Sequence, residues 1–388
     1  RVVFSDIDGT LVHYPNTQER VGKALPSKDD DYEAFQPNDR DEKEDPDMLL
    51  KLPQSATGLV GVISMDTLSM AQQLRNAGHR FVLVTGARSK TSIQRMPHLP
   101  MVDAFVMENG GRIMLLEPDH TRGPSAPATS TMPDTQDLCT FLNITIPYKE
   151  DTSWRERHSD VAGPTSQDHL APEERKGALW DTYRELKSSG WKLDALSYTT
   201  CFRITTRGKE EAFRAVMASL PPSLACSFNL GKADIYPATS GKDRATEYIM
   251  EMFGAAAEDC VAMCDDDNDI LMAQSVGHAY LPGITSETMD EIVAQRPDHF
   301  TVAGLEGTRG TEQVMRQIIE VFGCSFFDDE EEVAFPVLGG SLDETPRVAQ
   351  PGRAQATSPS AALPRRRGWA PAPGRVWGAR TAQHTRVR

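Results

Sequence analysis

The sequence predicts an α/β protein with a doubly wound, Rossmann-like parallel sheet and an inserted α+β domain. Two observations lead to this prediction. Short apolar runs alternate with segments of helical periodicity at both ends of residues 1–325, and this alternation is typical of parallel strands joined by crossover helices. Between residues 112 and 235 the rhythm changes to helices followed by paired strands, which indicates a separate inserted unit.

The first core segment, residues 1–111, begins with an apolar, β-branched run that predicts a buried strand at residues 2–4. Ser64 then precedes apolar residues at helical spacing and Gly78 follows them, so we expect a helix between these two signals. The alternation continues with a strand at 81–84, a helix at 90–96 and a strand at 104–107.

Residues 13–57 interrupt this alternation directly after the first strand. Pro, Asn and acidic residues dominate the stretch, which is typical of a solvated loop. Its position beside the first strand also allows a mobile flap over a site, and the sequence leaves both interpretations open.

The insert is expected to span residues 112–235 and to form a cap domain. A linker rich in Pro, Ser, Thr and Ala occupies residues 123–133. Periodicity then predicts helices at 172–188 and 209–220 and strands at 193–206, 225–230 and 233–236.

The alternation resumes in the second core segment, residues 236–325. This segment and the first one flank the insert and form one discontinuous domain. We expect a helix at 241–253, a strand at 260–264, a helix from about Asp269, edge strands at 278–281 and 300–302, and a last helix at 311–322.

The C-terminal part, residues 326–388, predicts a disordered tail. From Thr345 onward it holds nine Arg and no Asp, Glu or Lys, together with abundant Pro, Ala and Gly. Such a composition buries too little apolar surface to fold. A solvated tail and a docking arm for an acidic partner both remain open.

Composition limits the partners and the compartment. The formal net charge of −15 disfavours nucleic acid as a partner. The six cysteines form no CxxC pair, which favours a reducing compartment, cytoplasmic or organelle stroma, over secretion. No stretch reaches the roughly 18 apolar residues of a membrane span, so we expect a soluble protein without a membrane partner. Protein partners stay open.

An acidic motif, DIDGT at residues 6–10, follows the first strand. Ligands of open parallel sheets bind at the C-terminal ends of the strands. One carboxylate can serve as nucleophile and metal ligand, and the other can exchange a proton with the leaving and entering oxygens. A turn with acidic side chains is the alternative interpretation.

A second acidic cluster, DDDND at residues 265–269, also follows an apolar strand. Its oxygens suit a hard cation such as Mg²⁺, and the two clusters meet if their strands are neighbours. A calcium loop is excluded because neither Gly at the sixth position nor Glu at the twelfth follows Asp265. A solvated acidic turn remains the alternative.

Two further positions suit a phosphate group. Thr85 and Gly86 end a strand, where a hydroxyl and a backbone N–H can hold a phosphate oxygen. Lys242 precedes a helix and can neutralise phosphate charge. Each signal is weak alone, because such residues at helix starts are usually structural.

Taken in this order, the four motifs resemble the haloacid dehalogenase (HAD) superfamily of phosphatases over residues 1–325. The position of the insert is similar to that of a type-two cap, and DIYPATSGK at residues 234–242 resembles the branch of sucrose-phosphate phosphatases and Cof-like enzymes. The resemblance implies a Mg²⁺-dependent phosphatase for a small phosphorylated metabolite of the sugar-phosphate class.

The resemblance also implies a role for each motif residue. Asp6 is expected to be the nucleophile that forms an aspartyl-phosphate, and Asp8 the general acid and then base. Thr85, Gly86 and Lys242 are expected to bind the phosphoryl group. The implied magnesium ligands are Asp6, the backbone carbonyl of Asp8, Asp265 and Asp269, with Thr10, Asn109 and Asn268 as candidate neighbours of the metal or substrate.

Some features depart from the family pattern. Cys264 stands where Gly is usual, and Ala87 separates Gly86 from Arg88, which weakens a phosphate role for Arg88. The turn that contains Asn109 is expected to be structural. A phosphomutase and a non-catalytic binding protein on the same fold remain alternatives, although the nucleophile and the acidic cluster are both present.

Overall fold

A computed structural model of the chain describes residues 1–14, 23–26, 33–36, 48–54, 60–117, 147–229 and 232–324. The described residues belong to one compact unit. The expected tail, the linker at 123–133 and most of the 13–57 stretch lie outside them.

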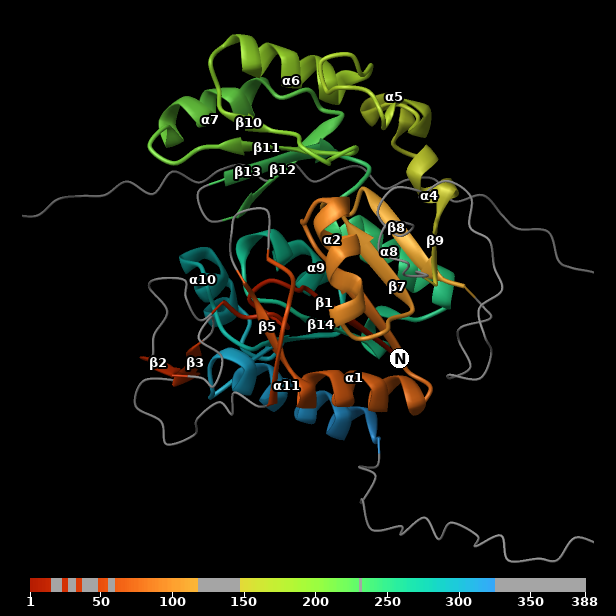
Figure 1. Cartoon of the computed structure of the whole chain (residues 1–388), viewed down its shortest axis with the longest axis vertical. Coiled ribbons are helices and arrows are strands. Elements are labelled where there is room, and N and C mark those ends of the chain that lie inside the picture. The colour runs from red at the N-terminus through yellow and green to blue at the C-terminus, as the bar shows by residue number, and fades with distance from the viewer. Residues whose placement is uncertain are drawn as a thin grey trace, which may run out of the picture. The chain divides into compact units, whose positions relative to one another are not determined.

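An eight-stranded sheet forms the centre of the core (Figure 1). Its strand order is β16 (Phe300–Val302), β15 (His278–Leu281), β14 (Cys260–Met263), β1 (Val2–Ser5), β6 (Arg80–Val84), β7 (Ala104–Met107), β8 (Arg112–Leu116) and β9 (Tyr148–Glu150). The strands from β16 to β7 are parallel, and β8 and β9 add antiparallel pairs at one edge. The predicted doubly wound sheet is therefore confirmed.

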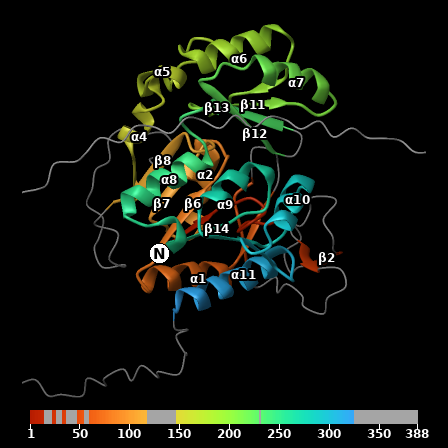
Figure 2. The ribbon, with the colours of Figure 1, turned by 180° about the vertical axis from the view of Figure 1, so that it is seen from behind.

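Helices cover both faces of this sheet. They are α1 (Met65–Asn76), α2 (Ser89–Arg95), α8 (Lys242–Phe253), α9 (Ile270–Ser275), α10 (Glu287–Gln295) and α11 (Gly307–Phe322). The view from behind shows α8 on the near side of β7 and β8 (Figure 2). The short 3-10 turns η2 (Met96–His98), η5 (Ala257–Asp259) and η6 (Asp267–Asp269) complete the connections.

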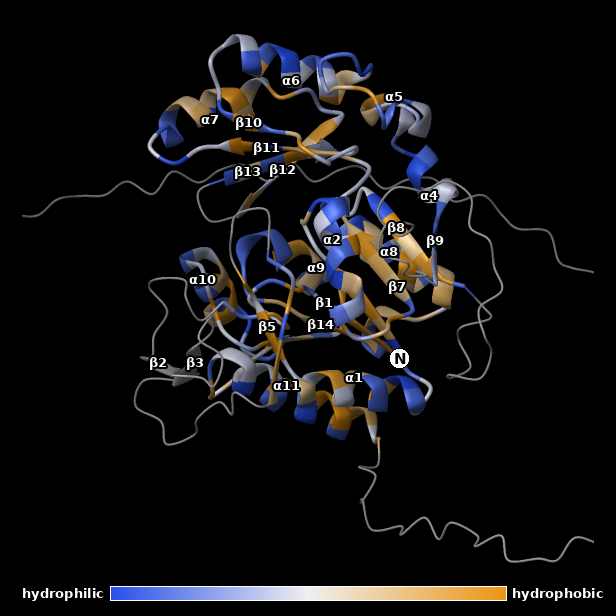
Figure 3. Cartoon of the chain, viewed as in Figure 1, coloured by the Kyte–Doolittle hydropathy of each residue, from blue (hydrophilic) through white to orange (hydrophobic). Residues whose placement is uncertain are grey.

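Successive strand residues alternate between two hydrophobic cores. Val3 packs in one core with residues of α1 and α11, whereas Val2 and Phe4 pack in the other with residues of α8, α9 and α10. Because both faces are covered, the strands read as continuous apolar runs. Figure 3 shows these apolar strands between helices that also carry polar residues.

The predicted helix after Ser64 is confirmed with its expected signals. Ser64 Oγ accepts a hydrogen bond from the Thr67 backbone N–H at 3.0 Å. The helix ends at Asn76, and Gly78 follows with a φ of +85°. This left-handed conformation is easily adopted by glycine.

The inserted cap contains a second, antiparallel sheet. Its strand order is β10 (Leu193–Asp194), β11 (Phe202–Thr205), β13 (Lys232–Pro237) and β12 (Leu224–Asn229). Helices α6 (Ala178–Ser188) and α7 (Glu210–Ser219) pack on one face through Trp180, Phe202 and Phe213. Two short helices, α4 (Thr152–Glu156) and α5 (Ser159–Ala162), precede them.

Two elements of the cap differ from their expected form. The expected strand at 193–206 is interrupted between β10 and β11, where Ser197 has a φ of +60°. The expected helix at 172–188 begins only at Ala178, because Gly177 before it has a φ of +117°. In both places a residue with positive φ marks the point where the expected element is interrupted or delayed.

The chain also enters the core sheet where the sequence placed the insert. Residues 112–116 and 148–150 form β8 and β9 of the core sheet. β8 turns back on β7 through residues 108–111, with Met107 opposite Arg112. A hairpin at the sheet edge has no crossover helix, so the strand–helix alternation gave no sign of it.

The described parts of the 13–57 stretch form two small sheets with their surroundings. β2 (Lys23–Pro26) pairs with β3 (Glu33–Gln36), and β4 (Leu49–Lys51) pairs with β5 (Val62–Ser64). The stretch leaves the core at His13, which forms two backbone hydrogen bonds of 2.9 Å with Val62. Among the described helices, none has both the length and the apolar character that crossing a membrane requires.

Candidate active site

The two acidic motifs meet at the C-terminal ends of β1 and β14. These strands are neighbours, with Ser5 opposite Met263, so the residues that follow them emerge side by side. Asp6, Asp265 and Asp269 are buried, and one carboxylate oxygen of each lies within 4.8 Å of the others.

Lys242 places a positive charge in this carboxylate group. It is the first residue of α8, and its Nζ lies 2.7 Å from Asp6 Oδ1 and 2.6 Å from Asp269 Oδ1. The Asn268 side-chain oxygen is 3.4 Å away. Burial favours the neutral amine, but Asp269 and Asp6 outweigh it and raise the pKa of Lys242. The lysine therefore stays protonated.

One ammonium group does not balance three carboxylates. Burial and the charge of Asp269 raise the pKa of Asp265 to about 8. The same two causes raise the pKa of Asp6, although Lys242 opposes them. Among the described residues, Asp269 Oδ2 is buried without a hydrogen-bond partner. Crowded, partly unpaired oxygens of this kind fit a divalent cation.

The turn after β1 brings its backbone close to Asp265. Gly9 has a φ of +96°, and a Cβ there would lie 2.2 Å from Asp265 Oδ2. Thr10 Oγ1 donates to Asp265 Oδ1 at 2.8 Å. The hydroxyl of Thr285, which the sequence did not suggest, lies 2.9 Å from the Asp265 backbone oxygen and 3.2 Å from Asp265 Oδ2. Hydroxyl groups therefore lie beside both carboxylate oxygens of Asp265.

Asp8 lies outside the group of three carboxylates. Its Oδ1 accepts a hydrogen bond from Arg95 Nη1 at 2.7 Å and another from the Tyr14 hydroxyl. The sequence suggested neither partner, because neither residue belongs to a recognisable motif. The side chain of Asp8 is 38% exposed, so this carboxylate reaches solvent while Asp6 does not.

Thr85 and Gly86 follow β6, the strand beside β1. Thr85 Oγ1 accepts a hydrogen bond from the Ala87 backbone N–H at 3.0 Å. A Cβ on Gly86 would lie 2.7 Å from Asn109 Oδ1, so glycine permits this close approach. The two expected phosphate-binding positions therefore follow the strand that neighbours β1, as Asp6 follows β1 itself.

Asn109 links this loop to the cap. Its Nδ2 donates to Asp234 Oδ2 on β13 at 2.9 Å, and Arg203 binds both oxygens of Asp234 at 2.6 Å. Asn109 has a φ of +53°, and its own side-chain oxygen is buried without a partner in the described structure. Asn109 thus lies in the expected turn and also joins it to the cap, and its place near a substrate or metal stays a prediction.

Two other core residues bind the cap directly. Arg88 Nη2 lies 2.6 Å from Asp194 Oδ2, which engages this side chain away from a phosphate. Glu108 Oε2 accepts four hydrogen bonds of 2.8 to 3.2 Å from the backbone and hydroxyl groups of Thr199 and Thr200. Strand β12 of the cap also lies against η6.

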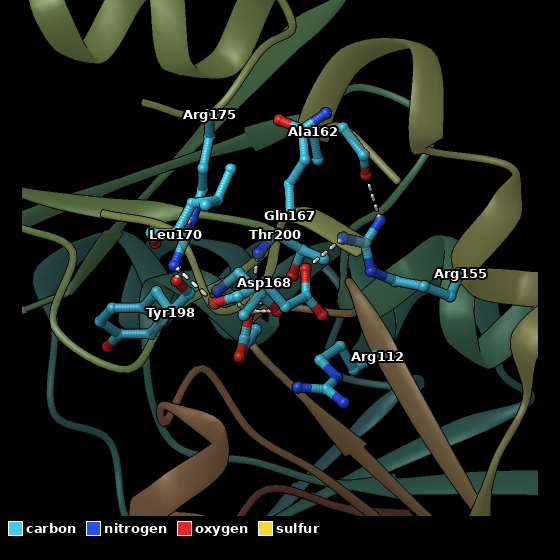
Figure 4. Close-up of polar contacts among 12 residues, drawn as sticks. Arg112, Arg155, Ala162, Gln167, Asp168, Leu170, Arg175, Tyr198 and Thr200 are labelled. Carbon is cyan, nitrogen blue, oxygen red and sulfur yellow. Dashed lines mark hydrogen bonds and ion pairs between the residues drawn. The ribbon is translucent and has the colours of Figure 1, made fainter. Parts of the chain in front are cut away.

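Buried arginines support the cap segment that Glu108 binds (Figure 4). Arg175 donates to the backbone oxygens of Tyr198, Leu170 and Asp168 at 2.7 to 3.0 Å. Arg155 binds Asp168 Oδ1 at 3.0 Å. These contacts hold the backbone next to Thr199 and Thr200.

Cys264, which stands where the family pattern has Gly, is accommodated by the core. It packs among residues of α8 and α9 in the hydrophobic core on that face. Its backbone N–H donates to Tyr280 O at 3.2 Å. Burial raises the pKa of its thiol, so it remains a small apolar residue behind Asp265.

Comparison with known proteins gives a family match. The model of the family described as haloacid dehalogenase-like hydrolase matches residues 61–291. A haloacid dehalogenase-like hydrolase from Bacillus subtilis is 14% identical, with a TM-score of 0.45, over 83% of this chain and 92% of its own. The sucrose-phosphatase from Synechocystis is 15% identical, with a TM-score of 0.44, over 67% and 91%. A phosphatase from Bacteroides thetaiotaomicron is 15% identical, with a TM-score of 0.44, over 84% and 96%. No curated protein matches the sequence significantly.

Proposed function

The chain belongs to the haloacid dehalogenase-like hydrolases, and from that premise we propose that it hydrolyses a small phosphomonoester with Asp6 as the nucleophile. The observation that carries the proposal is the buried group of Asp6, Asp265 and Asp269 around Lys242. Buried like charges that only one cation offsets are costly unless a ligand compensates them. A divalent cation supplies such compensation and lets a negatively charged phosphate approach Asp6.

The proposed reaction has two steps. Asp6 attacks phosphorus, the P–O bond to the alcohol breaks, and the departing oxygen takes a proton from Asp8. Water then attacks the aspartyl-phosphate, Asp8 accepts a proton from that water, and phosphate leaves as Asp6 is restored. Catalysis of this kind depends mainly on alignment and charge stabilisation.

We assign each charge change of this reaction to a group of this chain. The Thr85 hydroxyl, the Gly86 N–H and the Lys242 ammonium are proposed to bind the transferring phosphoryl oxygens. Asp6, Asp265, Asp269 and the backbone carbonyl of Asp8 are proposed to hold magnesium. The bound ion would neutralise the spread negative charge on the phosphoryl group. The orphaned Asp269 Oδ2 supports this ligand set.

The proposed substrate class is a sugar phosphate. Besides the resemblance in the sequence, the cap sheet supports it. The face of that sheet opposite α6 and α7 carries polar side chains, among them Asp194, Arg203 and Asp234. Asp194 and Asp234 contact the core beside the expected phosphate loop. Hydroxyl-rich leaving groups are bound by polar side chains of this kind.

Phosphate release by the wild type and by Asp6→Asn tests the proposal. Both proteins are chelated and then assayed with a panel of sugar phosphates, with and without magnesium. The expected result is release by the wild type with magnesium only and none by the variant. Equal release by the two proteins contradicts the proposal, and transfer to a second hydroxyl without free phosphate indicates the phosphomutase alternative.

A further inference from the structure

The carboxylate of Asp8 is held by two side chains that also bind each other. Arg95 Nη1 donates to Asp8 Oδ1 at 2.7 Å, and Arg95 Nη2 donates to the Tyr14 hydroxyl oxygen at 2.5 Å. The Tyr14 hydroxyl in turn donates to the same Asp8 oxygen. Asp8, Arg95 and Tyr14 are therefore joined pairwise by three hydrogen bonds.

Arg95 is buried although Asp8 is not. The Arg95 side chain is 4% exposed and that of Asp8 is 38% exposed. Asp8 is the sole carboxylate that forms an ion pair with Arg95 in the described part of the chain. Desolvating a guanidinium is costly, so its placement here is explained by the contact with Asp8.

Both partners are themselves fixed by the fold. Arg95 is the last residue of α2. The Tyr14 ring lies against Gly61, where a Cβ would be 3.0 Å from the ring. The preceding residue, His13, is joined to Val62 by two backbone hydrogen bonds of 2.9 Å. The donors therefore come from two anchored segments, while Asp8 lies directly before the turn at residues 9–11.

These contacts distinguish the two oxygens of Asp8. Oδ1 accepts both hydrogen bonds, whereas no group in the described ranges donates to Oδ2. We propose that Arg95 and Tyr14 are positioning residues, which hold Oδ1 so that Oδ2 delivers the proton to the departing oxygen. The inference rests on the proposed phosphatase function.

The dependence of the rate on the leaving group tests this role. A poor leaving group needs the proton during bond cleavage, whereas a good one departs without it. 4-Methoxyphenyl phosphate has the poor leaving group and 4-nitrophenyl phosphate the good one. For Arg95→Met, kcat/KM with 4-methoxyphenyl phosphate should fall about 100-fold, which is within the range of general acid catalysis. With 4-nitrophenyl phosphate, kcat/KM should fall about 3-fold or less. The ratio kcat/KM is chosen because it covers only the steps up to alcohol release.

Two further variants sharpen the result. Arg95→Lys keeps a donor and should recover part of the loss with the poor leaving group. Tyr14→Phe removes one hydrogen bond and keeps the ring, so it should show the same pattern with a smaller loss. If Arg95→Met does not fold, Tyr14→Phe carries the test alone.

Arg75→Met is the matched control. Arg75 is also a largely buried arginine, but it pairs with Asp103 near the start of β6, away from the strand ends that carry Asp6. The kcat/KM of Arg75→Met should be unchanged for both substrates.

Two outcomes overturn the inference and leave the proposed function intact. One is an equal loss of kcat/KM with both substrates in folded Arg95→Met or Tyr14→Phe, and the other is no loss at all. A wild type no faster than Asp6→Asn instead contradicts the proposed function.

Discussion

Two buried carboxylate sites of this protein have opposite electrostatics. At Glu108, burial alone would raise the pKa, but Arg112 and hydrogen bonds from Ser89, Thr199 and Thr200 outweigh it, so the pKa is lowered. At Asp265, burial and the charge of Asp269 raise the pKa to about 8. Equal burial thus gives opposite results, because the nearest charge is the Arg112 guanidinium at Glu108 and the Asp269 carboxylate at Asp265.

The charge of Glu108 stabilises the fold, whereas the charges around Asp6 are proposed to bind ligands. Glu108 is fully provided with donors and joins the core to the cap. The site around Asp6 and Asp265 also has donors, but it holds three carboxylates against one ammonium group, and Asp269 Oδ2 has no partner among the described residues. Changes at the second site should therefore affect catalysis, and changes at the first should affect stability.

The largest effect is expected for Asp6→Asn. The amide has nearly the same shape but is a poor nucleophile, so turnover should fall to background. Burial and nearby carboxylates raise the pKa of Asp6, so its charge is costly in the folded protein. Because the substitution removes this charge, the melting temperature of the variant should equal or exceed that of the wild type. Phosphate release and thermal melting measure the two outcomes. Substantial remaining activity would show that Asp6 is not the nucleophile.

The next effect concerns the metal. Asp265→Ala removes a proposed ligand, so the magnesium concentration for half-maximal activity should rise at least about 10-fold. Turnover should fall with it and recover partly at high magnesium. A magnesium titration of the chelated proteins measures the shift. Asp66→Ala, at a half-exposed position on α1, is the control, and an unchanged midpoint in Asp265→Ala contradicts the ligand assignment.

The raised pKa of Asp265 also predicts how stability changes with pH. Its folded pKa of about 8 lies above the ordinary value of 3.8, so between these values the folded state binds more protons than the unfolded state. Stability of the metal-free protein should therefore fall as the pH rises from about 4 to 8. Magnesium should reverse the fall. Melting temperatures in chelator and in magnesium measure both, and a flat profile in chelator contradicts the prediction.

The smallest effect is expected at Glu108, whose carboxylate already has its hydrogen-bond donors. Glu108→Ala leaves the Thr199 and Thr200 backbone N–H groups without their acceptor and should cost about 1–3 kcal/mol of unfolding free energy. Because the folded pKa of Glu108 is lowered, its contribution is present above the ordinary pKa and is lost as the pH falls. Denaturant unfolding at neutral and acidic pH measures this. A stability difference that does not shrink in acid would show that the charge is unimportant.

Much of the fold could be predicted because its signals are local. Buried parallel strands such as residues 81–84 are apolar on both faces, and the motif residues follow strand ends in the chain order of the family. The edge strands β8 and β9 were missed because no helix separates β8 from β7, so the strand–helix alternation does not mark them. The excursion from residue 13 was recognised by composition alone.

The candidate site was only partly predictable for a different reason. Asp6, Asp265 and Lys242 belong to motifs, whereas Arg95, Tyr14 and Thr285 act through contacts between distant segments. An arginine at the end of a helix is unremarkable in sequence. Its partner Asp8 is 87 positions away in the chain, and only the fold brings the end of α2 to the residues that follow β1.

The bridge between His13 and Val62 has a consequence for how this protein can diverge. The long excursion begins and ends at two backbone hydrogen bonds, and near its end Leu50 and Leu52 also pack against the core. Each doubling of such a loop costs only about 0.6 kcal/mol of closure entropy. Insertions between Tyr14 and Leu49 are therefore expected to cost the core little. Selection can lengthen this stretch while Tyr14, at its root, keeps its place beside Asp8.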